Sequence, residues 1–147
     1  MDHEMNWLYL LNAEAFAVQV SPLNKSVHEQ MDWTVFITAI DEDPGRYSTV
    51  GILTGASEDF EFNVGVSGMI RATEVFDPNH MTDAMRDLVS DSIGLENLYD
   101  VAARTGRLAL SLANREFEIS DKAPTPDIKT MEDITDDESI SDASEAH

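Results

Sequence analysis

The chain contains no cysteine, and this absence removes three kinds of chemistry. A disulfide framework, a thiolate zinc site and a cysteine nucleophile are all excluded. Histidine is scarce as well, and the four copies lie far apart in the sequence, without the spacing of metal ligands. We therefore expect no metal site and no cofactor. The histidines are His3, His28, His80 and His147.

Long hydrophobic runs are also missing, since no apolar stretch approaches the roughly 20 residues of a membrane-spanning helix. Asp2 and Glu4 give the N-terminus the wrong charge for a signal peptide. The sequence thus predicts a soluble cytoplasmic protein without membrane insertion.

Positive charge is in short supply. Lysine and arginine number 9 against 29 aspartates and glutamates, which gives a net charge of −20. A field of that sign repels nucleic acid and attracts basic partners, so we expect no nucleic-acid binding through a basic patch. The same charge also keeps many small proteins soluble, so the charge by itself identifies no partner.

Catalytic motifs are absent too. Among 29 acids, pairs of carboxylates are inevitable and carry no information about acid–base catalysis. The run Gly65-Val66-Ser67-Gly68 lies inside a strand-like pattern, with no lysine after it and no helix starting there, so it is no phosphate-binding loop. The sequence predicts a protein that is not an enzyme.

The first half of the chain carries strand-like patterns, rich in β-branched and aromatic residues and separated by turn-forming residues. The first of these segments ends before Pro22, which favours a strand, although its alanines also suit a helix. Its alternation places Phe16, Val18 and Val20 on one face. We predict a four-stranded antiparallel sheet with the first segment at one edge. The predicted strands lie within residues 6–20, 33–40, 46–56 and 60–70.

Further along the chain, the apolar spacing changes to about 3.6 residues, which indicates helices. Asp77-Pro78 has the form of an N-cap followed by proline, Gly94 interrupts the pattern, and Gly106 suits a C-terminal cap. We therefore predict a helical pair within residues 77–106 and an α+β fold. For residues 108–119, an extended segment and a further short helix both stay open.

The last part of the chain is acidic. From Ser120 onward it has nine acids, two lysines and no aromatic residue. Such a segment cannot bury enough apolar surface to offset the entropy lost on ordering. We predict one folded domain over residues 1–119 and a disordered acidic tail over residues 120–147.

Trp33 follows a connecting segment, residues 21–32, that has more apolar side chains than a solvated loop needs: Leu23, Val27 and Met31. In one interpretation this loop folds over the sheet and Trp33 belongs to the core. In the other, these side chains line a groove for the apolar residues of an extended partner. Tryptophan suits such a groove because it offers a large area with few rotamers to freeze.

The order of these parts resembles the SecB-type export chaperones, including the SecB-like chaperones that accompany toxin–antitoxin pairs. The Asp32-Trp33 pair lies about ten residues after Pro22, where that family keeps a groove tryptophan. The resemblance covers roughly residues 5–119, but Ser111-Leu112-Ala113-Asn114 lacks the prolines that family members tend to carry there. Two further segments are similar to the toxin–antitoxin chaperones, Asp59-Phe60-Glu61-Phe62 and Thr105-Gly106-Arg107-Leu108-Ala109-Leu110.

This resemblance implies an ATP-independent holdase, a homotetramer built as a dimer of dimers, that binds unfolded preproteins or a dedicated client. It also implies an acidic patch on the sheet that recruits the translocase motor SecA. A holdase exposes apolar surface, and a charge of −20 per chain would limit its self-association. The implied groove residues are Leu23, Val27, Met31, Trp33, Leu108 and Leu110, and the implied acidic patch is Glu14, Glu58, Asp59 and Glu61.

A different class of function stays open, namely an acidic interaction module such as a nucleic-acid mimic or an inhibitor of a basic protein. Its binding would be one-to-one, sensitive to salt and indifferent to unfolded chains.

The groove interpretation has a signature of its own. Trp33→Ala should weaken capture of an unfolded polypeptide by about 1–3 kcal/mol. Global stability should then fall by less than the roughly 3–5 kcal/mol expected for a core tryptophan.

Overall fold

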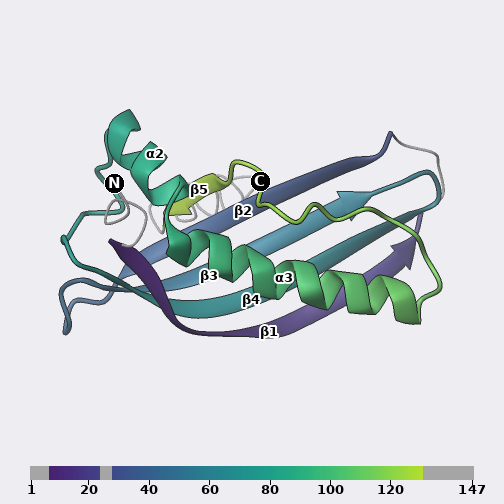
Figure 1. Ribbon diagram of the computed structural model, residues 1–147, viewed down its shortest axis with the longest axis horizontal. Helices are drawn as coiled ribbons and strands as arrows, with labels where there is room; N and C mark the ends of the chain where they lie inside the picture. The colour runs from purple at the N-terminus through teal and green to yellow at the C-terminus, as the bar shows by residue number, and fades with distance from the viewer. Residues whose placement is uncertain (1–6, 24–27, 131–147) are drawn as a thin grey trace, which may run out of the picture.

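The computed structural model describes residues 7–23 and 28–130, and it has an α+β fold with a five-stranded mixed sheet (Figure 1). The strand order is β1-β4-β3-β2-β5. The four long strands are antiparallel to their neighbours, as predicted, and β5 is a short addition parallel to β2. The elements are β1 (Leu8–Pro22), β2 (Gln30–Ala39), β3 (Arg46–Ala56), β4 (Phe60–Ala72), α2 (Asp83–Ser90), α3 (Ile93–Leu112) and β5 (Asp127–Thr130).

The core lies between the sheet and α3, which crosses one face of it (Figure 1). Alternating residues of the central strands point to that face and are buried, whereas their neighbours on the other face keep part of their surface in solvent. This is the expected pattern for a sheet covered by helices on one side. The buried strand residues include Trp33, Val35, Ile37, Tyr47, Leu53, Phe60, Phe62, Val64, Val66 and Ile70.

The alternation in β1 differs from the prediction because the strand contains a bulge. Ala15 pairs with Val66 but Ala17 pairs with Gly65, so one extra residue, Phe16, fits between them. The Phe16 ring lies against the bare face of Gly65, where a Cβ would be 2.7 Å from it. A bulge of this kind shifts the alternation by one residue. Phe16 therefore points away from Val18 and Val20, and 57% of its surface is exposed.

The helices begin later and end later than predicted. α2 starts at Asp83, where the Thr82 hydroxyl accepts a hydrogen bond from Met85 N at 3.1 Å. Asp77 instead accepts from Asn79 N in a turn. The break between the helices falls at Asp91, and Gly94 lies in the first turn of α3.

Gly106 is not a C-terminal cap, because α3 continues through it to Leu112. The helix ends instead with Asn114 in the left-handed region, at φ 58°. Arg115 N donates to Leu110 O and Asn114 N donates to Ser111 O, which is the pair of hydrogen bonds of a Schellman motif. Residues 108–119 are thus helical as far as Leu112 and non-helical beyond Asn114.

Residues 114–130, called the return segment below, run back beside α3 from its C-terminal end to the edge of β2 (Figure 1). Ile119 and Ile128 are buried, and β5 pairs with β2. The prediction of disorder from residue 120 is therefore wrong for residues 120–130, because these two isoleucines and the free edge of β2 hold them. The remainder of the predicted tail, 131–147, lies outside the described residues. In the described part of the chain, no helix is both long and apolar enough to span a membrane.

Candidate functional site

The return segment packs between α3 and the helix-side face of the sheet, and we call the space that its apolar side chains fill the groove. The Phe117 ring meets Phe60 and Phe62 edge-on, with centroids 6.5 and 5.0 Å apart. Ile119 packs against Gly106, where an added Cβ would be 2.9 Å from Ile119 Cδ1. The groove thus already holds the apolar side chains of an extended polypeptide, supplied by the chain itself.

The helices hold this segment mainly by its backbone. Arg107 Nη2 donates to Ile119 O at 3.0 Å and to Ser120 O at 3.2 Å, and Tyr99 Oη donates to Ser120 O at 2.6 Å. Farther along, Glu96 Oε1 accepts from Ala123 N at 3.2 Å, and Arg86 Nη1 donates to Ile128 O at 3.0 Å. We call these four side chains the backbone-binding row: Arg86, Glu96, Tyr99 and Arg107. Their partners are atoms that every polypeptide offers.

Two contacts of this row involve side chains of the segment instead. Arg107 forms an ion pair with Asp121, at 3.1 Å, and the Tyr99 hydroxyl lies 3.1 Å from Ser120 Oγ. Asp121 is fully exposed, and exposed ion pairs contribute little to stability. Burial raises the pKa of Tyr99, although its hydrogen bond to Ser120 lowers it in part. Tyr99 therefore keeps its proton at neutral pH and remains a donor.

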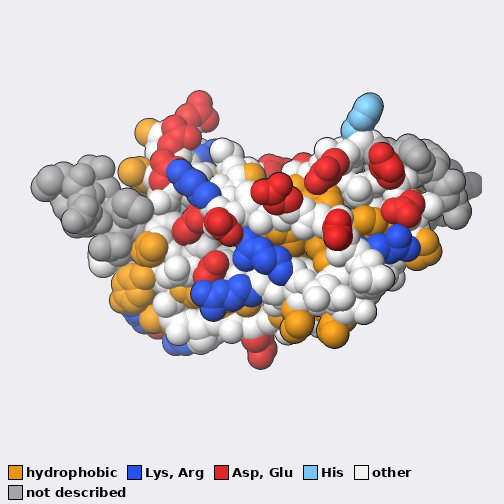
Figure 2. Space-filling model, turned by 45° about the vertical axis from the view of Figure 1, so that its right-hand side comes forward, with side chains coloured by type: hydrophobic (Ala, Val, Ile, Leu, Met, Phe, Trp, Pro, Cys, Tyr) orange, Lys and Arg blue, Asp and Glu red, His pale blue; other side chains and the backbone are white. Residues whose placement is uncertain are grey.

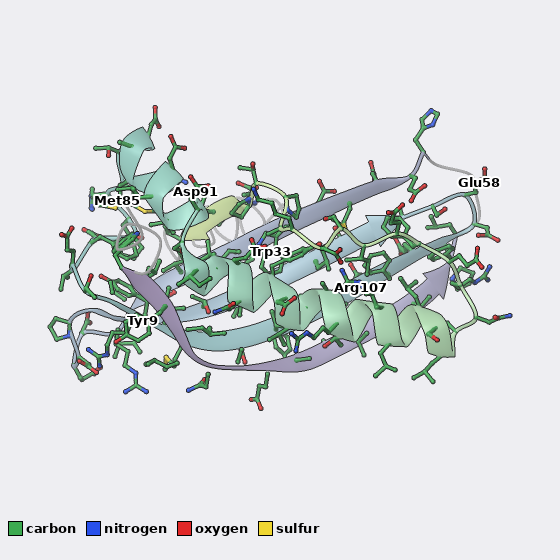
Figure 3. All side chains as sticks on the ribbon, in the orientation of Figure 1. Tyr9, Trp33, Glu58, Met85, Asp91 and Arg107 are labelled. Atoms are coloured by element: carbon green, nitrogen blue, oxygen red, sulfur yellow. The ribbon has the colours of Figure 1, made fainter. Side chains whose placement is uncertain are left out.

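Trp33 lies beneath these elements, with 2% of its surface exposed (Figure 3). Its ring meets Tyr99 edge-on at 5.5 Å, and it covers Gly51, where a Cβ would be 2.3 Å from the ring. Among the described residues, no acceptor lies within hydrogen-bond distance of Trp33 Nε1. The structure places Trp33 in the core, below the groove instead of on an open wall of it.

The structure brings only some of the other predicted groove residues close to the core. Met31 is half-buried and packs against the core, and Leu23 donates its backbone N–H to Asp59 O at 2.8 Å. Leu110 is buried, whereas Leu108 points to solvent with 62% of its surface exposed, because two residues turn a helix to its opposite face. Val27 lies outside the described residues.

The predicted acidic patch is also divided. Glu58 and Asp59 form the turn between β3 and β4, at one end of the sheet, and Glu61 follows in β4 (Figure 3). Asp59 is paired with Arg115 at 3.1 Å. Glu14 lies opposite Ser67, roughly 20 Å from Glu61 along the strands at about 3.3 Å per residue. The structure therefore groups three of the four acids and leaves Glu14 apart.

Two hollows separate the return segment from the helices. One, of about 520 Å³, is lined by Arg107, Leu110, Arg115 and Phe117 among others. The second, of about 630 Å³, lies between the start of α3 and the stretch from Lys122 to Pro126. Figure 2 shows this side of the molecule, with acidic and basic side chains between patches of exposed apolar surface. The segment is thus anchored at several points, with solvent-filled hollows beside it between them.

Sequence reasoning missed the backbone-binding row, because all but one of the residues that it contacts, Ile119 being the exception, were assigned to a disordered tail. One signal was present. Phe117 and Ile119 alternate with Glu116 and Glu118, which is the pattern of an extended segment with one buried face. Nothing local pointed to β5, where Ile128 is an isolated apolar residue.

No protein-family model and no curated protein matches the sequence. Among solved structures, the chain is similar to the Mycobacterium tuberculosis SecB-like chaperone Rv1957, in complex with a ChAD peptide from the antitoxin HigA1, Rv1956. The TM-score is 0.54 at 6% sequence identity, and the match covers 77% of this chain and 89% of that one. At this identity the likeness is one of fold. The chain has a SecB-like fold.

Proposed function

We propose that this protein is an ATP-independent chaperone, a holdase, that binds non-native polypeptides in the groove beside α3. The observation that carries the proposal is the return segment itself. It is extended, it inserts Phe117 and Ile119 into the groove, and it is held through its backbone. A surface that holds one extended apolar chain in this way suits others, because backbone contacts do not depend on sequence.

The SecB-like fold supports the same conclusion. The structural neighbour was solved with a peptide from an antitoxin bound to it. For the present chain we propose unfolded preproteins or one dedicated client as partners, in the cytoplasm. The predicted groove residues keep a part in this proposal: Trp33 and Leu110 as buried support beneath the groove, and Leu23, Met31 and Leu108 as its margins. Val27, outside the described residues, stays a predicted groove residue.

We further propose that the chain assembles with copies of itself into a homotetramer. β1 is the outermost strand, and among the described residues no strand lies beside its free edge. Leu11 and Val18 are exposed along it, and Leu112 on α3 is 80% exposed. Two separate apolar surfaces of this kind suit a dimer of dimers.

We propose that the acidic turn between β3 and β4 is the site that recruits SecA. Glu58, Asp59 and Glu61 form a small acidic group, and Arg115 partly neutralises it through Asp59. If this group is the docking site, Glu58→Lys with Glu61→Lys should abolish SecA binding, whereas Glu14→Lys should have a smaller effect.

The central test is capture of a reduced, carboxymethylated polypeptide that cannot fold, without ATP. We expect stable complexes and suppressed aggregation at both low and high salt, because the groove offers apolar packing and hydrogen bonds to uncharged backbone groups, which salt screens far less than pairs of exposed charges. Failure to capture any unfolded chain would refute the proposal. One-to-one binding to a folded basic protein, lost at high salt, would favour an acidic interaction module instead.

A further inference from the structure

We propose that the return segment is a resident occupant of the groove that a client displaces. The client then takes its place as an extended strand parallel to β2, with its backbone held by Arg86, Glu96, Tyr99 and Arg107. This inference rests on the proposed chaperone function, and it names the chemistry of the client: an unfolded polypeptide with apolar side chains at alternate positions.

The contacts of the segment favour replacement by another chain. Four helix side chains bind its carbonyl and amide groups, which any incoming polypeptide also offers. The apolar positions it fills are equally general, because Phe117 meets two aromatic rings and Ile119 meets a glycine. No described contact of the row requires the sequence of this particular segment, apart from those of Asp121 and the Ser120 hydroxyl.

The segment is also attached lightly. β5 covers only the part of β2 from Thr34 to Ile37, with Thr34 opposite Asp127 and Ile37 opposite Thr130. Open hollows of about 520 and 630 Å³ border the segment where it runs beside the helices, so solvent reaches it there. Segments with few buried contacts open at a lower free-energy cost than the core. The sheet edge and the groove can therefore be vacated together while β1 to β4 and α3 stay in place.

The edge that the segment would leave is suited to a client. An uncovered strand presents unpaired N–H and C=O groups, and an extended peptide completes the sheet by pairing with them.

Occupation by its own chain also sets the strength of client binding. The apparent affinity is the intrinsic affinity reduced by the fraction of molecules whose groove is vacant. Fixing the segment must therefore weaken client binding, and loosening it must strengthen client binding.

A disulfide between β5 and β2 tests whether fixing the segment weakens client binding. Thr34→Cys with Asp127→Cys joins two register partners, and the parent has no cysteine to interfere. We expect the oxidised protein to bind the reduced, carboxymethylated polypeptide at least tenfold more weakly, and reduction to restore the parent affinity. As a matched control, Thr38→Cys with Ser48→Cys joins β2 to β3 without touching the segment and should not change binding.

A variant with a weakened β5, together with amide exchange, tests whether loosening the segment strengthens client binding. Ile128→Ser should raise the affinity for the same polypeptide at least threefold, since it removes the buried anchor of β5. On client binding, amides 127–130 should lose protection while amides 34–37 keep theirs.

Two results would overturn the inference. One is that the oxidised Thr34→Cys, Asp127→Cys protein binds the polypeptide as tightly as the parent. The other is that amides 127–130 stay protected from exchange in the complex with the polypeptide. If the disulfide does not form, the Ile128→Ser protein provides the test. A folded Ile128→Ser protein that binds the polypeptide more weakly than the parent would also overturn the inference. A parent protein that captures no unfolded polypeptide at all refutes the chaperone function instead, so the two failures are distinguishable.

Discussion

The long strands at the two sides of the sheet, β1 and β2, differ in whether another strand covers them. β1 is 15 residues long and lies at the outside of the sheet, with Phe16 and Val18 exposed along it. β2, at the other side, is covered by the four residues of β5 from the same chain. An uncovered edge is open to pairing with another chain, and proteins normally protect it. The contrast teaches that a chain can cover one side of its sheet with a strand of its own while the opposite edge has no strand beside it among the described residues.

Emptying the Trp33 site should have the largest effect on the β2 side. Because Trp33 is buried against Gly51 and Tyr99, Trp33→Ala should lower the free energy of unfolding by about 3–5 kcal/mol. Urea unfolding measures this loss, and Val75→Ala, at an exposed position without an assigned role, is the control. A loss below about 1 kcal/mol, with client capture weakened, would support the open-groove interpretation drawn from the sequence.

Truncation compares the two ends of the return segment. A chain that ends after Ala123 loses β5 and the burial of Ile128, and should lose about 1.5–3 kcal/mol of stability. A chain that ends after Thr130 keeps every described contact, and its melting temperature should stay close to that of the parent. Equal melting temperatures for both truncated chains would mean that β5 is not part of the stable fold.

A lysine on the β1 edge tests whether this edge pairs with a second copy. Val18→Lys should weaken association by about 1–3 kcal/mol, the range for a central interface residue. Light scattering should then report a smaller particle than the parent. Gln19→Lys places the same charge on an exposed neighbouring position of the strand and is the matched control. Identical masses for all three proteins would remove β1 from the interface.

The smallest expected effect concerns Tyr99. Tyr99→Phe removes the hydrogen bond to Ser120 O and should cost about 0.5–1.5 kcal/mol. Burial raises the pKa of Tyr99 above its ordinary value of 10.0, so the folded state favours the protonated hydroxyl. Its contribution is therefore complete below pH 10 and is lost as the pH rises beyond it.

Thermal melts from pH 8 to pH 11 check this expectation. The difference in melting temperature between the parent and Tyr99→Phe should shrink as the pH rises. A constant difference across this range would show that the hydroxyl proton does not matter.

The sheet could be predicted because its signal is local. Phe60, Phe62 and Val64 alternate with polar residues, and burial follows that alternation. The bulge at Phe16 could not, because it depends on Gly65 in another strand offering room for the ring. The prediction that Gly106 ends the helix was wrong for the same reason. Glycine tends to end helices, but here packing against Ile119 overrides that tendency.

The candidate site was harder to predict than the fold. In the sequence, nothing distinguishes Arg86, Glu96 and Arg107 from other charged residues on the surface of a helix. They share a role only because the return segment runs past all three. β5 depends on a partner strand far away in the sequence, so composition alone indicated a tail. The acidic character of this part of the chain did not prevent Ile128 from being buried.

Gly106 has one more consequence, for the cooperativity of the protein. A glycine in the middle of a helix costs roughly 1 kcal/mol relative to alanine, so α3 has a weak point at its centre. Ile119 fills the space that the missing side chain leaves, and Arg107, the next residue, holds the Ile119 carbonyl. The return segment thus stabilises the second half of α3. That half should open more readily than the first half once a client has displaced the segment, although α3 as a whole stays folded.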